Sequence, residues 1–224
     1  MKSKLIIILI IAFVFGCKAQ NSDFNQYICN FGNKELPLLL SPNAESWNIF
    51  NQGYDKLQGK TYKSISEGIV EKYICSDEFC NPDNGYYRYD YGVKINVSND
   101  FYTVLVRKIK YERDSEWDFD LDEDLLITYT KTGEILSRKS LSKDNDRWQS
   151  SLSFTKDKII VQQIKNTASE VSLEKIMSCE VWTTEYQISS KGIIEVKSTS
   201  PKVNKAIKWN DKFFKYELVI SNSR

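Results

Sequence analysis

The chain contains no histidine, and this absence excludes several enzyme mechanisms at once. Histidine is the general base of Ser-His-Asp and Cys-His enzymes, and it supplies two zinc ligands in the HExxH motif. Three Ser-x-x-Lys patterns, which begin at Ser140, Ser153 and Ser172, have no accompanying motif of the kind that serine–lysine enzymes carry. We therefore expect no catalytic residues and no enzymatic activity.

Sequence signals for nucleotides and nucleic acids are missing too. There is no GxGxxG fingerprint and no P-loop, and strands and helices do not alternate along the chain. The 31 basic residues are nearly balanced by 30 acidic ones, so no excess positive charge favours nucleic acid. We expect no cofactor, no nucleotide and no nucleic-acid partner.

The apolar run at the N-terminus is too short to cross a membrane as a helix. It covers residues 5–15, whereas a transmembrane helix needs about 20 apolar residues. Lys2 and Lys4 precede the run and Gly16-Cys17 ends it, which is the arrangement of a cleavable export leader.

The end of this leader, Val14-Phe15-Gly16-Cys17, resembles the lipobox of bacterial lipoproteins. The resemblance implies that residues 1–16 are removed, that the Cys17 thiol receives a diacylglycerol, and that the new N-terminus is acylated, for example with palmitate. Two or more acyl chains are needed for stable anchoring, and this modification supplies them. The alternative is an ordinary secretory signal cut near Ala19, with Cys17 incidental.

Such a protein belongs to the cell envelope, held by lipid more often on the outer membrane, with its domain in the periplasm or at the cell surface. Removal of residues 1–16 leaves 208 residues, enough for one sizeable domain. We expect a lipidated Cys17 and a polar tether over residues 17–35, followed by a single β-rich domain over residues 36–224.

Four cysteines remain after Cys17, and an even number in an exported chain permits two disulfides. Cys75 and Cys80 bracket a short polar loop and are a plausible pair. Cys29 and Cys179 would then pair by elimination, although four cysteines allow three pairings. We expect no metal site, because there is one close cysteine pair and no histidine.

Two short helices are expected near the start of the domain. Ser41-Pro42 is typical of a helix start, and Trp47 and Phe50 follow at helical spacing. A second helix is predicted at about 66–75, after the capping-box spacing of Ser64 and Glu67. Before them, residues 36–40 could form a first strand or an edge segment.

From Tyr86 onward the apolar period changes to two, which predicts strands. The tight turns at 131–134 and 189–192 contain Gly133 and Gly192 and predict hairpins. The expected strands cover residues 86–91, 93–97, 101–111, 125–130, 135–141, 150–155, 158–164, 180–189 and 193–198, with a last hairpin over 208–220. The fold class is mainly β, with an α+β margin: an antiparallel meander or sandwich-like sheet.

Two of these hairpins carry a second resemblance. Residues 125–136 (LLITYTKTGEIL) and 186–193 (YQISSKGI) resemble hairpins common in small lipoproteins of the Bacteroidota. That group has no agreed activity, so the resemblance implies a compartment and an architecture more than a function.

Asp118, Asp120 and Asp122 alternate with apolar residues, and Glu123 and Asp124 follow. On a strand the three aspartates would share one face, about 7 Å apart. They could bind Ca²⁺, although the glycine of an EF-hand loop is missing, or serve as paired carboxylates of a hydrolase. The simpler interpretation is a solvated strand face that protects a sheet edge.

Tyr87, Tyr89 and Tyr91 alternate along a predicted strand and could form a stacking platform for sugars or peptide. Tyrosine is also an ordinary strand residue, so core or cross-strand packing is the simpler interpretation. Taken together, the sequence predicts a non-enzymatic, lipid-anchored binding domain whose partner is another protein, in an immunity, inhibitor or accessory role. An envelope hydrolase and a carbohydrate-binding module are the alternatives.

Overall fold

The computed structural model describes residues 22–40, 63–75, 86–111, 119–145, 147–172, 174–210 and 215–219. This part of the chain forms twelve strands and two short helices, which confirms the mainly β class. The helices are α2 (Ser22–Cys29) and α4 (Glu67–Tyr73). The strands are β1 (Gly32–Lys34), β2 (Leu38–Leu40), β3 (Tyr86–Ile95), β4 (Phe101–Tyr111), β5 (Phe119–Thr130), β6 (Ile135–Asp144), β7 (Trp148–Phe154), β8 (Ile159–Asn166), β9 (Met177–Ile188), β10 (Ile194–Thr199), β11 (Val203–Asn210) and β12 (Lys215–Leu218).

The strands form two sheets. Sheet A has the order β1-β3-β4-β5-β6, in which β1 runs parallel to β3 and the other neighbours are antiparallel. Sheet B has the order β12-β11-β9-β8-β7-β2 and is antiparallel throughout. Strand β10 pairs with β9 on the same edge as β11.

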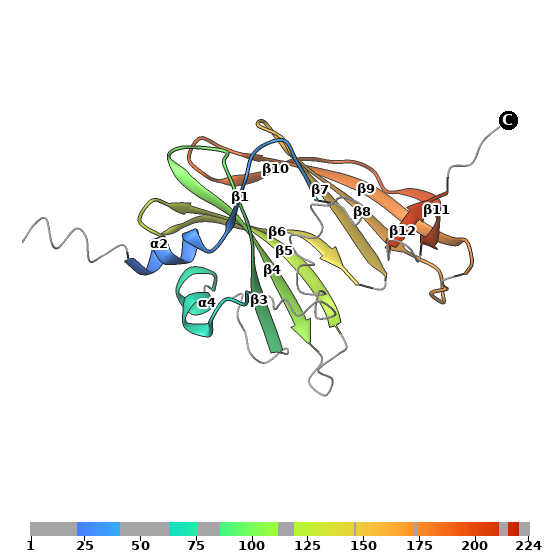
Figure 1. The fold of residues 1–224 in the computed structure, drawn as a ribbon. Coiled ribbons are helices and arrows are strands. Elements are labelled where there is room, and N and C mark those ends of the chain that lie inside the picture. Colours follow the sequence, from blue (N-terminus) through green and yellow to red (C-terminus); the bar gives the residue numbers. More distant parts are fainter. Residues whose placement is uncertain are drawn as a thin grey trace, which may run out of the picture.

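The two helices, sheet A and sheet B form three layers (Figure 1). Val104 and Ile127 point toward the helices, whereas Leu105 and Leu126 point toward sheet B, because successive strand residues face opposite ways. The cluster between the sheets is completed from sheet B by Leu38, Leu40, Leu152, Phe154, Ile159, Val161 and Tyr186.

A third apolar cluster lies on the other face of sheet B. Ile159 and Val161 of β8 face sheet A, so Ile164 faces away from it. Ile164 packs with Cys179 of β9 and with Tyr216 of β12. The sheet therefore buries side chains on both faces, at different positions along β8 and β9.

Helix α2 shows that part of the N-terminal segment belongs to the domain. Phe24, Tyr27 and Ile28, with Phe31 just after the helix, follow the i, i+3, i+4, i+7 spacing and are all buried. The prediction of a polar tether is therefore wrong from residue 22 onward. Asp23, Asn25 and Gln26 are exposed on the solvent face of the helix, and they make the average composition of the segment polar. Residues 17–21 lie outside the described part.

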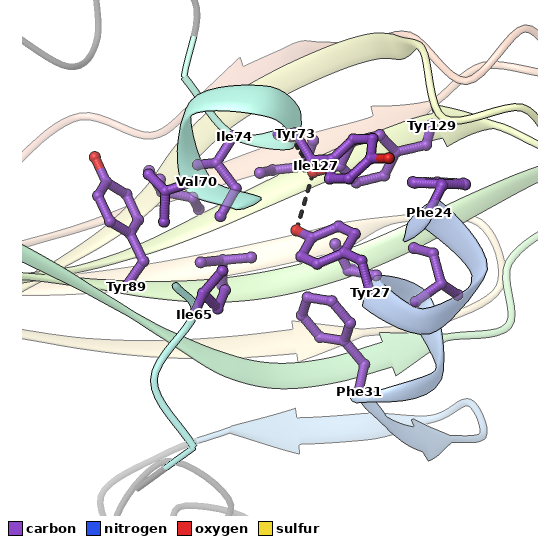
Figure 2. Packing of buried hydrophobic residues seen from close by; sticks show 14 residues of the cluster. Phe24, Tyr27, Phe31, Ile65, Val70, Tyr73, Ile74, Tyr89, Ile127 and Tyr129 are labelled. Carbon is purple, nitrogen blue, oxygen red and sulfur yellow. Dashed lines mark hydrogen bonds between the residues drawn. The ribbon is translucent and has the colours of Figure 1, made fainter. Parts of the chain in front are cut away.

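Helix α2 is fixed to sheet A through aromatic rings and one buried hydrogen-bond chain (Figure 2). Tyr27 and Tyr73 stack with ring centroids 5.2 Å apart. The Tyr129 hydroxyl donates to the Tyr73 carbonyl at 2.5 Å, so the Tyr27 hydroxyl donates to Tyr129, 3.1 Å away. Burial raises the pKa of both Tyr27 and Tyr129. The two helices and β5 thus share one buried polar contact.

Helix α4 corresponds to the helix predicted at 66–75. Its N-cap is Ser66, so the predicted capping box of Ser64 with Glu67 is wrong. The Ser64 hydroxyl donates to Asp90 Oδ1 at 3.1 Å instead. The helix predicted from Ser41-Pro42 lies outside the described residues. Within those residues, no helix is long and apolar enough to cross a membrane.

Four turns gather at one end of the sandwich, which we call the turn end. They cover residues 96–100, 131–134, 155–158 and 189–193 and join β3–β4, β5–β6, β7–β8 and β9–β10. Gly133 and Gly192 take φ values of 103° and 80°, a region that glycine occupies without strain. The Thr128 hydroxyl donates to the Gly192 carbonyl at 2.5 Å and ties the two sheets together here. We call the opposite end, with the β6–β7 and β8–β9 connections, the distal end.

Candidate functional site

The cysteines correct one prediction. Cys29 and Cys179 are free, so the disulfide expected between them is wrong. Cys29 is exposed on α2 and Cys179 is buried in the third cluster, so both sheets lie between them. Burial raises the pKa of the Cys179 thiol. Cys75 is disulfide-bonded, but its expected partner Cys80 lies outside the described residues, as does Cys17, the predicted lipidation site.

The acidic segment leads into the middle of a sheet. Strand β5 lies between β4 and β6, so the interpretation that the acidic residues protect a sheet edge is wrong. Asp118 and the side chains of Asp120 and Asp122 lie outside the described part, so calcium binding there stays an alternative that the structure does not test. Among the described residues, no three His, Cys, Asp or Glu side chains gather as a metal site.

The last residue of this segment, Asp124, forms a buried ion pair. Its side chain is 1% exposed, and Arg107 of β4, 4% exposed, approaches its Oδ1 with Nε at 3.4 Å. The Ser142 hydroxyl of β6 donates to Asp124 Oδ2 at 2.6 Å and accepts from the Asp124 backbone N–H at 3.1 Å. Arg107 and Asp124 lie on the face of sheet A that carries Leu105 and Leu126, toward sheet B.

The ion pair is part of a row that crosses sheet A. Asp90 of β3 stands opposite Arg107 in the strand register and is buried. Arg88 donates to Asp90 Oδ2 through Nε and Nη2 at 3.2 and 2.9 Å. Both described aspartates of the row accept hydrogen bonds from arginine and serine, so the row is suited to fixing strand register.

The tyrosine-rich strand splits between core and surface. Tyr89 is buried in the cluster under the helices, and Tyr91 packs against Phe31 with ring centroids 5.0 Å apart. A β-bulge between Tyr91 and Val93 then shifts the alternation, so that Val93 faces sheet B. Tyr89 therefore lies in the core, and Tyr87 and Tyr91 are partly buried against it. Tyr87 also lines a surface groove.

That groove contains the candidate site, which we call the lysine cluster: Tyr87, Lys108, Glu123 and Lys143. Lys108, Glu123 and Lys143 are register neighbours on β4, β5 and β6, so they form a row on the helix-bearing face. Lys108 Nζ lies 3.7 Å from Glu123 Oε2, and Lys143 Nζ lies 3.8 Å from Oε1. Lys108 Nζ also lies 4.2 Å from the centre of the Tyr87 ring.

The lysine cluster is partly withdrawn from water. The side chains of Lys108 and Glu123 are 12% and 15% exposed, whereas Lys143 is 49% exposed. Tyr87, Lys108, Lys110 and Glu123 line a cleft of about 70 Å³. Burial lowers the pKa of Lys108, and positive Arg138 and Lys143 lower it further, against the opposing effect of Glu123. The single Glu123 carboxylate thus lies between the two ammonium groups of Lys108 and Lys143. The excess charge leaves a concave, positively charged surface beside the Tyr87 ring.

Sequence reasoning found Tyr87 but missed the lysines beside it. The sequence of β4 contains an indication of this site. Val104 and Val106 are followed, at the same period of two, by Lys108 and Lys110, so one face of the strand changes from apolar to basic. Glu123 was grouped with the aspartates before it, although it lies on the opposite face from Asp124.

A second cleft, of about 140 Å³, lies at the turn end between the two sheets. Its floor is apolar and its rim carries lysine and serine side chains; it is lined by Val97, Ser98, Phe101, Thr155, Lys156, Asp157, Lys158, Ile159, Ile188, Ser189 and Ser190. It brings together three of the four turns.

Each cleft could hold a small polar or anionic group. In comparisons with known proteins, no family model, no curated protein and no solved structure matches this chain.

Proposed function

We propose that the chain is a membrane-anchored lipoprotein of the cell envelope, whose β-sandwich binds another protein and catalyses no reaction. The leader that ends in Gly16-Cys17 carries this proposal, because an apolar run closed by a small residue and cysteine is typical of lipid-anchored export. An immunity, inhibitor or accessory role suits such a protein.

The carboxylates of Asp90, Glu123 and Asp124 support a binding role over a catalytic one. Asp90 and Asp124 accept hydrogen bonds from arginine and serine inside the fold, and Glu123 lies between two lysines. A glycosidase needs two carboxyl groups facing a substrate across a cleft, with one held protonated. Asp90, Glu123 and Asp124 do not provide that arrangement.

The lysine cluster is the surface that we assign to the partner. Tyrosine is favoured at protein interfaces, and positive charge guides an acidic partner to its binding site and fixes its orientation. The partner surface that fits is therefore acidic, with a carboxylate that can reach Lys143 at the open side of the row.

The test is photo-crosslinking in intact cells. A photoreactive amino acid replaces Tyr87, and a matched control carries it at exposed Lys197 on β10. We expect one crosslinked protein from position 87 and none from position 197, and we expect Lys143→Glu to remove the product. If position 87 crosslinks to no protein while the domain binds glycans, the protein-binding proposal is wrong.

A further inference from the structure

The short segment between Cys17 and α2 limits how the domain can lie on a membrane. Ser22 follows Cys17 by five residues. A fully extended chain spans at most ~3.6 Å per residue, so Ser22 lies within about 18 Å of Cys17. If Cys17 is lipidated, as in the proposed function, Ser22 lies within that distance of the membrane surface.

Helix α2 is fixed at the turn end. The Phe24 ring covers Gly133 in the β5–β6 turn, where an added Cβ would lie 2.8 Å from the ring. The same ring lies 6.0 Å from that of Tyr102, the second residue of β4. Figure 1 shows α2, in blue, beside the β5–β6 hairpin.

The distal end lies a full strand length away. Strand β4 has 11 residues and starts at the turn end. At ~3.3 Å per residue it spans about 36 Å, twice the reach of the segment before α2. An orientation with the distal end on the membrane and the turn end pointing away would require more reach than five residues provide.

The turn end also has the surface chemistry of a membrane contact. The four turns carry exposed lysines at 131, 156, 158 and 191, against the exposed acids Asp100, Glu134 and Asp157. Ile135 and Ile193, at the ends of two turns, are 37% and 40% exposed. Basic side chains next to exposed apolar ones favour an anionic membrane interface.

We propose that the turn end lies against an anionic phospholipid surface, where its lysines contact headgroup phosphates and Ile135 and Ile193 enter the interface. The proposal rests on the lipidation of Cys17 in the proposed function. It places the lysine cluster, in the distal half of β4, on the side that faces away from the membrane and toward a partner.

The experiment uses the mature lipoprotein reconstituted in vesicles of phosphatidylcholine with phosphatidylglycerol, in a Cys29→Ser background. One fluorophore is attached through Lys191→Cys at the turn end and, as the matched control, through Lys175→Cys in the β8–β9 connection. Both lysines are exposed, and buried Cys179 reacts slowly with the label. Nitroxide-labelled lipid headgroups then quench any fluorophore at the surface.

We expect the label at position 191 to lose most of its fluorescence and the label at 175 to keep it. Equal quenching, or stronger quenching at 175, would overturn the orientation. Omitting phosphatidylglycerol, or changing Lys131, Lys156 and Lys158 to Gln, should weaken the quenching at 191; unchanged quenching in both cases would overturn the headgroup contact. If the protein lacks acyl groups and does not float with vesicles, the proposed function fails and this orientation fails with it.

Discussion

Removal of the Asp124 carboxylate should be among the most destabilising single changes in sheet A. Asp124→Asn keeps the size of the side chain but takes its negative charge from Arg107, which is 4% exposed. It also replaces a carboxylate oxygen that accepts from Ser142 at 2.6 Å. The change is confined to charge and hydrogen bonding, since it leaves no cavity.

The size of the effect follows from burial. Breaking a buried ion pair by removing one partner costs about 3–5 kcal/mol, because the remaining charge is left desolvated. Replacing both partners with apolar residues of similar volume is often neutral or stabilising, by up to about 4 kcal/mol. The double change Arg107→Met with Asp124→Leu should therefore recover most of the stability, with Asp90 still bound to Arg88 and Ser64.

The assay is urea denaturation of the three proteins, read by tryptophan fluorescence, with the slope checked for two-state behaviour. We expect Asp124→Asn to lower the unfolding free energy by about 3 kcal/mol or more and the double variant to lie near the native protein. A loss below about 1 kcal/mol, the range of a solvent-exposed pair, would refute the reasoning. A double variant as unstable as the single one would refute it as well.

Three further predictions concern the helix layer and the cysteines. Burial raises the pKa of Tyr89 to about 12 in the folded protein, whereas an unfolded tyrosine ionises near pH ~10. The contribution of Tyr89 to stability is therefore complete below pH ~10. It is lost as the pH rises from about 10 toward 12, because the unfolded state loses its proton first. Tyr89→Phe should flatten this part of an alkaline stability curve, and an unchanged curve would contradict the assignment. Gly133→Ala should cost about 1–3 kcal/mol, because φ is 103° and the new Cβ would meet Phe24; a loss of a few tenths would show that α2 does not cover the turn. A thiol reagent should react quickly at Cys29 and at Cys179 only on unfolding, as Cys29→Ser and Cys179→Ser variants would show; fast reaction at Cys179 would contradict its burial.

Much of the sheet architecture could be predicted from local sequence. Gly133 and Gly192 mark the two tight turns, and strand β4 and strands β6 to β10 follow the predicted segments to within three residues. Strand β5 begins at Phe119, six residues before the predicted start at 125. Local signals suffice here because each hairpin pairs neighbours in the chain, and the two tight turns each place a glycine at positive φ.

Helix α2 and the bulge in β3 were missed for different reasons. The four buried residues of the α2 segment have helical spacing, but the segment is short and its low mean hydropathy favours a tether. Packing on sheet A stabilises the helix, and the periodicity of a short segment does not reveal this tertiary packing. The bulge turns Val93 to the opposite face from Tyr91, a change that a strict period of two cannot reproduce.

The candidate site was only partly predictable. Tyr87 was found, because tyrosine alternation is visible in the sequence, but the partners of Lys108 come from β5 and β6 and meet it through long-range register. Strand alternation separates Glu123 from Asp124, which are adjacent in sequence and face different layers. Glu123 and Asp124 belong to one acidic segment of the sequence, but Glu123 lies beside Lys108 whereas Asp124 lies beside buried Arg107.

The anchor is tested most directly by intact-mass spectrometry of the membrane fraction, comparing the native protein with Cys17→Ala. We predict that the native chain begins at Cys17, carries the mass of a diacylglycerol and an amide-linked acyl chain, and stays with the membrane. The Cys17→Ala chain should lack that mass and leave the membrane. If the acyl mass and the membrane association both survive the substitution, Cys17 is not the anchor and the proposed function is wrong.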